Sequence, residues 1–190
     1  MTTKGVRAFA AVLMTVFAAG CGYNTIQTYD EQVSAAASQI KVQLQRRADL
    51  IPNLVETVKA YAKQEQTVFT EVAEARAKLA GAVQSGDLQQ MAQANAQLTA
   101  PLGRLLAIAE NYPQLKSNEN FRALQDQLEG TENRIAVARQ DYNETVNRYN
   151  AYIRRFPQVL TAKVLGKGPR PYFELETPGA AQAPKVDFSK

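Results

Sequence analysis

Apolar residues recur along most of the chain at the three- and four-residue steps of amphipathic helices. The pattern predicts four helices, whose apolar faces begin near Val33, Val55, Met91 and Phe121. In chain order, these faces comprise Val33, Ala36, Ile40 and Leu44; Val55, Val58, Ala62, Glu65, Phe69, Val72, Arg76, Leu79 and Val83; Met91, Asn95, Leu98, Leu102, Leu105 and Ala109; and Phe121, Leu124, Leu128, Ile135, Ala138, Tyr142, Val146, Tyr149, Ile153 and Phe156.

Turn and capping residues separate the four runs. Pro52 lacks a backbone donor, so we expect the first helix to kink or end near Leu50. The Ser-Gly-Asp sequence at 85–87 predicts a helix stop and a new N-cap, the Ser-Asn-Glu sequence at 117–119 predicts a second cap, and Pro157 predicts an end. Short connections between such helices favour an all-α fold, an elongated antiparallel four-helix bundle with long, kinked helices.

The first residues follow a different pattern. Lys4 and Arg7 precede an apolar run, residues 8–19, of about 12 residues, which is the size of a signal-peptide core. A bilayer span needs about 20 apolar residues. The Ala-Ala-Gly-Cys sequence that ends at Cys21 resembles a lipobox, in which the signal is cut before the Cys and the Cys is acylated.

We therefore expect a lipoprotein of the cell envelope with lipid, palmitate included, on Cys21. Two or more acyl chains give stable attachment to a membrane. Gly22, where an Asp would retain the protein at the inner membrane, favours the outer membrane facing the periplasm if the cell has one. The chain then divides into a signal peptide (1–20), a tether (21–28), a helical bundle (29–157) and a C-terminal extension (158–190) that we expect to be largely flexible.

Composition narrows the chemistry. The chain has no His, no Trp and one Cys, which excludes His-based triads and Glu-x-x-His di-iron sites. We expect no enzymatic activity, no cofactor and no metal. Of 22 basic residues, Lys4 and Arg7 leave with the signal, so the mature chain is close to neutral against 18 acidic residues. This balance argues against nucleic-acid binding.

A polar cluster marks the expected break at Pro52. Arg46, Arg47, Asp49 and Asn53 form a candidate interaction corner that faces a partner. Alternatively, Arg47 and Asp49 pin the kink and Asn53 caps the next helix. We favour this structural interpretation.

Charged residues also fall on or beside the apolar faces: Glu65, Arg76, Glu110, Glu132 and Arg139. Their carboxylates have the chemistry of a cation site. We favour interhelical ion pairs, because a buried charge must be paired.

A third group, Tyr142, Asn143, Tyr149, Asn150 and Tyr152, has the residue types of a ligand groove. Tyrosines at helical spacing are more often core residues with their hydroxyls at the rim, and we favour that interpretation. The basic stretch that follows has the chemistry to contact anionic lipid or glycan phosphate, but we expect a solvated tail. It comprises Arg154, Arg155, Lys163, Lys167 and Arg170.

In this order, the motifs resemble the LemA family. They are Cys-Gly-Tyr-Asn at 21–24, QRRADLIPNLVETVKAY at 45–61, Glu-Ala-Arg at 74–76, AENYPQLK at 109–116, FRALQ at 121–125, RQDYN at 139–143, Tyr-Asn at 149–150 and Phe-Pro at 156–157. The resemblance covers the chain from about residue 21 onward. It implies an antiparallel helical bundle tethered at its N-terminus, and it supplies no reaction and no binding residues.

These features favour a membrane-tethered, non-catalytic scaffold or protein-interaction module with a protein partner in the envelope. The alternative is a helical bundle that binds a small ligand or a cation.

Overall fold

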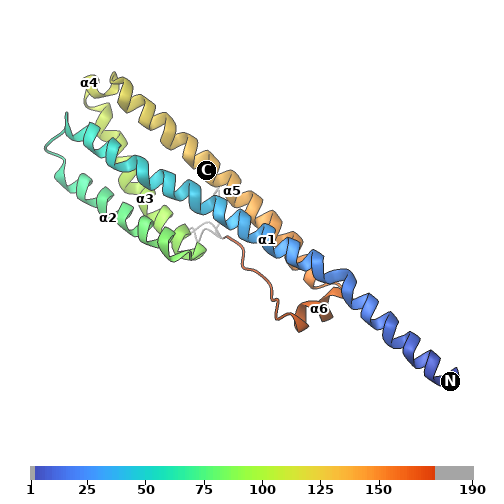
Figure 1. Cartoon of the computed structure of the whole chain (residues 1–190). Coiled ribbons are helices and arrows are strands. Elements are labelled where there is room, and N and C mark those ends of the chain that lie inside the picture. The colour runs from blue at the N-terminus through green and yellow to red at the C-terminus, as the bar shows by residue number, and fades with distance from the viewer. Residues whose placement is uncertain (1–2, 174–190) are drawn as a thin grey trace, which may run out of the picture. The chain divides into compact units, whose positions relative to one another are not determined.

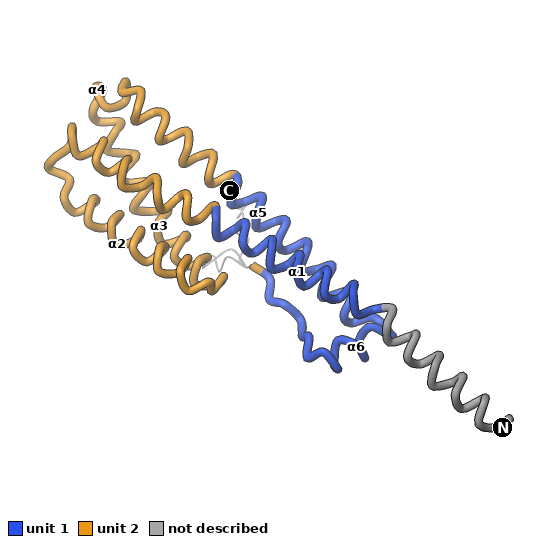
Figure 2. The backbone as a smooth tube through the Cα atoms, in the orientation of Figure 1, with its two compact units in different colours: residues 1–42, 134–172 blue, residues 43–133, 173–190 orange. Residues whose placement is uncertain are grey.

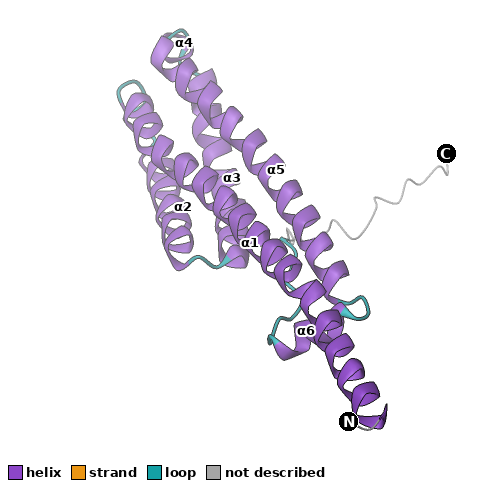
Figure 3. Cartoon of the chain, turned by 45° about the vertical axis from the view of Figure 1, so that its right-hand side comes forward, coloured by secondary structure: helices purple, strands orange, loops and turns teal. Residues whose placement is uncertain are grey.

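A computed structural model of the chain describes the backbone of residues 3–173 and the side chains of residues 22–173. This part of the chain contains six helices and no strand (Figures 1 and 3). The helices are α1 (Thr3–Lys59), α2 (Gln66–Ser85), α3 (Leu88–Glu110), α4 (Pro113–Lys116), α5 (Glu119–Ile153) and α6 (Gln158–Val164). The all-α class that the apolar periodicity predicts is therefore confirmed.

The chain divides into two compact units, shown in different colours in Figure 2. Among the described residues, unit 1 contains the first part of α1 up to Val42, α5 from Arg134, and α6 with the segment that follows it up to Tyr172. Unit 2 contains the rest of α1, then α2, α3 and α4, and α5 up to Asn133. A single elongated four-helix bundle over 29–157 stays a prediction.

α1 continues as a helix through Pro52 and ends at Lys59, so an end near Leu50 is wrong, and a kink there stays a prediction. Pro52 has no N–H to donate to the carbonyl of Ala48, four residues earlier. The structure supplies another donor, because the Arg76 side chain on α2 donates from Nε to the Ala48 oxygen over 2.9 Å. A buried carbonyl that the proline would orphan is thus satisfied from a neighbouring helix.

The end of α2 and the starts of α3 and α5 follow the predicted caps, whereas α5 ends at Ile153, before the end expected at Pro157. Gly86 adopts a left-handed φ of 75° after α2, and the Asp87 carboxylate accepts from the amides of Gln89 and Gln90 at the start of α3. Asn118 caps α5, accepting the Phe121 amide over 3.1 Å. These are short-range capping interactions, which local sequence specifies well.

The buried residues of the two units confirm most of the predicted apolar positions. In unit 1 the core includes Ile26, Val33, Ile40, Ile135, Tyr142, Val146, Tyr149 and Ile153. In unit 2 it includes Leu44, Ile51, Leu54, Val58, Phe69, Val72, Leu79, Met91, Leu98, Leu105, Leu115, Phe121 and Leu128. The predicted stripe fails at its last position, because Phe156 lies beyond the end of α5 and is 80% exposed.

Two further differences concern the ends of the expected bundle. Residues 21–28, expected as a tether, belong to α1, and Ile26 there is fully buried. The extension after Pro157 was expected to be largely flexible, but it begins with α6. This helix ends in a Schellman motif: Gly166 has a φ of 64°, its amide bonds the Lys163 carbonyl over 3.2 Å, and the Lys167 amide bonds the Ala162 carbonyl over 2.9 Å.

Some predictions fall outside this description. The signal peptide, the Cys21 thiol and residues 174–190 lie outside the described side chains. None of the helices, as far as they are described, combines the length and the apolarity that crossing a membrane requires.

Candidate functional site

α1 continues as a helix through the polar cluster at 46–53, so the expected break between two helices does not lie there. Arg47 points into unit 2, where its side chain is 5% exposed and pairs with Glu132 on α5. The same guanidinium donates from Nη1 to the Asn95 amide oxygen on α3 over 2.8 Å. Burial lowers the Arg47 pKa below its usual range, and the Glu132 charge opposes that shift. Arg47 therefore joins three helices and has no free face for a partner.

The other three corner residues, Arg46, Asp49 and Asn53, lie exposed on α1. Asp49 accepts from the Gln45 side chain over 2.8 Å, and the Asn53 carbonyl accepts from the Thr57 hydroxyl over 2.7 Å. Asn53 is inside α1, so its expected role as a helix cap is wrong. Steps of three and four residues place these side chains along one solvent-facing strip.

The five charged residues of the expected interhelical network do not meet at one place. Within unit 2, Glu132 pairs with Arg47, Arg76 bonds the Ala48 carbonyl, and Glu110 pairs with Lys116 over 2.6 Å at the surface. Glu65 directly precedes α2, whose Phe69 amide bonds its carbonyl over 3.3 Å. Arg139 belongs to unit 1. Among residues 22–173, no group of three or more acidic or sulfur ligands comes close enough to hold a metal ion.

In unit 1, the Tyr and Asn residues of α5 hold the segment after α6. We call this segment, residues 165–172, the strap. The Tyr142 hydroxyl donates to the Pro171 carbonyl over 3.0 Å, and the Tyr149 hydroxyl donates to the Gly168 carbonyl over 3.2 Å. Their rings are buried, as core tyrosines would be.

Asn150 makes two hydrogen bonds to the backbone of the strap. Its side-chain amide donates to the Arg170 carbonyl over 2.9 Å, and its oxygen accepts the Arg170 amide over 2.8 Å. This reciprocal pair copies the hydrogen bonding of a neighbouring β-strand. Asn150 is itself buried, so the pair forms away from water.

The strap is also tied to α1 by charge. Lys167 donates to Asp30 over 2.6 Å, and Arg170 donates to the other carboxylate oxygen over 2.7 Å from Nη2 and 3.1 Å from Nε. The Asp30 side chain is only 13% exposed. Burial raises the pKa of this carboxyl, but the hydrogen bonds and charges of Lys167 and Arg170 outweigh burial, so its pKa lies below the usual range.

The neighbouring groups respond to the same cluster. The hydrogen bond to Asp30 raises the pKa of Arg170 above its usual range. Burial raises the pKa of Tyr149, with a smaller contribution from the Asp30 charge, and burial also raises the pKa of Tyr142. Both phenols therefore stay protonated as donors to the strap.

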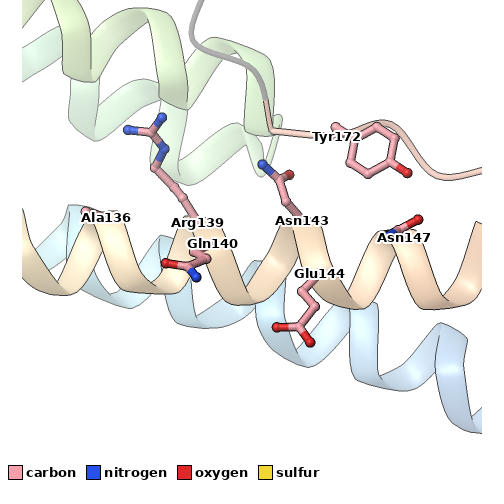
Figure 4. Close-up of a pocket in the computed structure, with 7 residues that line it drawn as sticks. All are labelled: Ala136, Arg139, Gln140, Asn143, Glu144, Asn147 and Tyr172. Atoms are coloured by element: carbon pink, nitrogen blue, oxygen red, sulfur yellow. The ribbon is translucent and has the colours of Figure 1, made fainter.

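A groove of about 810 Å³ opens along α5 of unit 1. Tyr172, at the end of the strap, lies above the side of α5 that carries Asn143 and Asn147, as Figure 4 shows. Glu144 points away from Tyr172 and pairs with Arg148. The complete lining is Ala136, Arg139, Gln140, Asn143, Glu144, Asn147 and Tyr172. The lining combines side-chain amides and a phenol with the charged side chains of Arg139 and Glu144.

Comparison with known proteins identifies the chain. The LemA family model matches residues 36–188. The chain belongs to the LemA family. This assignment confirms the resemblance carried by the motifs.

Three relatives of this LemA protein are magnetosome proteins. It is 29% identical over 180 residues to the magnetosome proteins MamQ 1 and MamQ 2 of Paramagnetospirillum magneticum strain AMB-1. It is 28% identical to the magnetosome protein MamQ of Magnetospirillum gryphiswaldense strain MSR-1. Each match covers 83% of this chain, and the chain spans 66% of the length of each relative.

Sequence reasoning found part of the site in this LemA chain. It singled out Tyr142, Tyr149 and Asn150, whose seven-residue spacing places 142 and 149 on one face of a helix. It missed Asp30, which lies inside α1. Two sequence features could have indicated the contact of Asp30 with the strap. Asp30 falls among the apolar positions of α1, and Lys167 and Arg170 are the two cations of a segment that otherwise holds mainly small residues and prolines.

Proposed function

We propose that this LemA protein is a non-catalytic protein-interaction module, held at a membrane of the cell envelope by lipid on Cys21. The observation that carries this proposal is that the buried charged and polar side chains bond within the fold itself. The side chains of Arg47, Asp30 and Asn150 each hydrogen-bond to another segment of the same chain. The solvent-facing strips of the helices then remain as the surface on which a partner binds.

Support for the anchor comes from the sequence alone. The single Cys of the chain follows a basic segment and a short apolar run at the place where a lipobox ends. The relatives are named as magnetosome proteins, a name that refers to a cell structure and to no particular reaction. We propose that this protein is located in the cell envelope. In a cell with an outer membrane, we propose that it is attached to that membrane and faces the periplasm.

The candidate binding strip is Arg46, Asp49 and Asn53, which lie exposed on α1 of unit 2. The test compares the Arg46→Ala/Asp49→Ala/Asn53→Ala variant with a matched surface triple on α5 of the same unit, Arg122→Ala/Asp126→Ala/Glu129→Ala. Both triples remove exposed charged or polar groups at steps of three and four residues.

Proximity labelling from the full chain in its own envelope reads out the result. We expect a defined set of envelope neighbours that is lost in the α1 triple and kept in the α5 triple. A separate Cys21→Ala variant should release the protein from the membrane fraction. Equal neighbour sets in both triples would refute the binding strip, and membrane retention of Cys21→Ala with unchanged mass would refute the anchor.

The groove beneath Tyr172 favours a second candidate, a small-ligand-binding bundle. Its amide groups suit a neutral polar ligand such as a sugar. Isothermal calorimetry with N-acetylglucosamine and glucose should show binding that the Tyr172→Ala and Gln140→Ala variants both weaken. Absence of heat with the unmodified chain would exclude these ligands.

A further inference from the structure

An exposed apolar stripe runs along α6 in unit 1. Phe156, Leu160 and Val164 are 80%, 55% and 87% exposed. Leu160 and Val164 lie four residues apart on α6, so their side chains project from successive turns on one side of the helix. Phe156 lies exposed just before the helix begins.

The opposite side of α6 holds the helix to its unit. Ala162 is buried, and Gln158 is half-buried. A Cβ built on Gly22 of α1 would lie 3.2 Å from the Gln158 Cγ. α6 thus rests directly on the residue that follows Cys21, in the part of α1 that belongs to unit 1 (Figure 2). The apolar stripe faces outward from this contact.

Charge around the stripe has one sign. Residues 145–173 contain six basic residues and no acidic residue. Arg148 is paired with Glu144, and Lys167 and Arg170 are paired with Asp30. The remaining three, Arg154, Arg155 and Lys163, are exposed and have no ion-pair partner among residues 22–173.

We propose that α6 docks on an anionic lipid surface, with Phe156, Leu160 and Val164 entering the interface and Arg154, Arg155 and Lys163 contacting lipid headgroups. This proposal rests on the proposed function, because lipid on Cys21 brings the neighbouring Gly22 to the bilayer. The combination of an apolar stripe, unpaired cations and no acid is that of an interfacial helix. It also gives the basic stretch a role in place of the solvated tail expected from sequence.

The test uses the full chain, purified from its own membranes and reconstituted into vesicles. Acylation blocks the thiol of the single natural Cys, so a fluorophore attaches only at an introduced one. The Leu160→Cys variant carries the label on the stripe, and the Val137→Cys variant is the control, since Val137 is exposed in the same unit at 58%. Nitroxide-bearing lipid quenches only a label that reaches the bilayer.

We expect strong quenching at position 160 in vesicles that contain phosphatidylglycerol, and little at position 137. Replacing Arg154, Arg155 and Lys163 by Gln should reduce the membrane-contacting population by up to about 100-fold, since each cation near an anionic surface contributes roughly a fivefold preference. The charge-matched triple Lys78→Gln/Arg122→Gln/Arg134→Gln should leave quenching at 160 unchanged.

Three results would overturn the proposal in different ways. Equal quenching at positions 160 and 137, with the Cys21 thiol blocked in the unmodified chain, would exclude lipid docking of α6 while leaving the anchor intact. A freely reactive Cys21 thiol in the membrane-purified chain would instead refute the anchor on which the proposal rests. Shielding at position 160 that requires an added envelope protein would assign the stripe to a protein partner and also contradict lipid docking.

Discussion

The two units satisfy the polar groups of α1 in different ways. In unit 2, side chains of other helices do so: Asn95 and Glu132 bind Arg47, and Arg76 binds the Ala48 carbonyl. In unit 1, Asp30 is instead bound by the strap, which has no regular secondary structure.

The difference has an energetic consequence. Helix-borne partners in unit 2 are already positioned by backbone hydrogen bonds and core packing. The conformation of the strap in unit 1 depends on the few polar contacts that it makes. Loss of these contacts should therefore disorder the strap. Segments of this kind open locally at lower free energy than packed helices do. Substitutions in unit 2 should therefore lower global stability, whereas those in unit 1 should free the strap first.

The largest effect is expected from Glu132→Ala in unit 2. Glu132 is 51% exposed, but its removal leaves the buried Arg47 charge with only Asn95. Breaking a buried pair by removing one partner costs about 3–5 kcal/mol, and the exposure of Glu132 places the loss near the lower end, about 3 kcal/mol. Urea unfolding measures it.

The reverse substitution sharpens this expectation. Arg47→Met removes the buried charge and leaves Glu132 free to be solvated, so it should cost less than Glu132→Ala although Arg47 is the buried partner. Glu129→Ala, a surface change one turn away, serves as the control and should be nearly neutral. Both variants remove the ion pair, so a larger loss for Arg47→Met than for Glu132→Ala would show that other contacts of Arg47, such as its bond to Asn95, outweigh the stranded charge.

Asn150→Ala should release the strap at a cost of about 2 kcal/mol, because two hydrogen bonds to Arg170 are lost and its backbone groups lose their partners. Hydrogen exchange should show lost protection at residues 165–172 with unit 2 unchanged. Asn147→Ala, an exposed position on the same helix, is the matched control. Uniform loss of protection across both units would contradict the proposed independence of the strap.

Asp30→Asn should cost about 1–2 kcal/mol at neutral pH, since charge-assisted hydrogen bonds to Lys167 and Arg170 weaken. The pKa of Asp30 is lowered in the folded chain, so its contribution is complete above the ordinary Asp pKa of about 3.9 and disappears as pH falls through the folded value. The stability difference between the unmodified chain and Asp30→Asn should therefore vanish in acid. Glu31→Gln should show no such pH-dependent difference, and a gap that persists at low pH would contradict this role.

The sequence alone predicted the structural features that depend on residues close together in the chain. The starts of α3 and α5 follow from caps at Asp87 and Asn118, which act within three positions. Periodicity likewise placed Tyr142 and Tyr149 in the core. It failed at Phe156, where the period continues past the end of α5 and the side chain is exposed.

Contacts between residues that are far apart in the sequence could not be predicted from the local pattern. Asp30 meets Arg170 across a separation of 140 positions, and neither residue has a signature that names the other. The end of the first helix predicted at Pro52 was wrong for the same reason. The local effect of this proline is to break a helix, but the compensating donor, Arg76, lies 28 positions from the Ala48 carbonyl that it satisfies.

That compensation gives the smallest of the expected effects and a direct test of it. Arg76→Met should cost about 1–2 kcal/mol, because the Ala48 carbonyl loses its only replacement donor beside Pro52. In a Pro52→Ala background, the backbone amide of residue 52 can bond Ala48 itself, so Arg76→Met should then cost at most about half as much. A double-mutant cycle from urea unfolding measures this coupling. Equal costs of Arg76→Met in the two backgrounds would show that Arg76 stabilises unit 2 only by packing and that α1 passes Pro52 without its help.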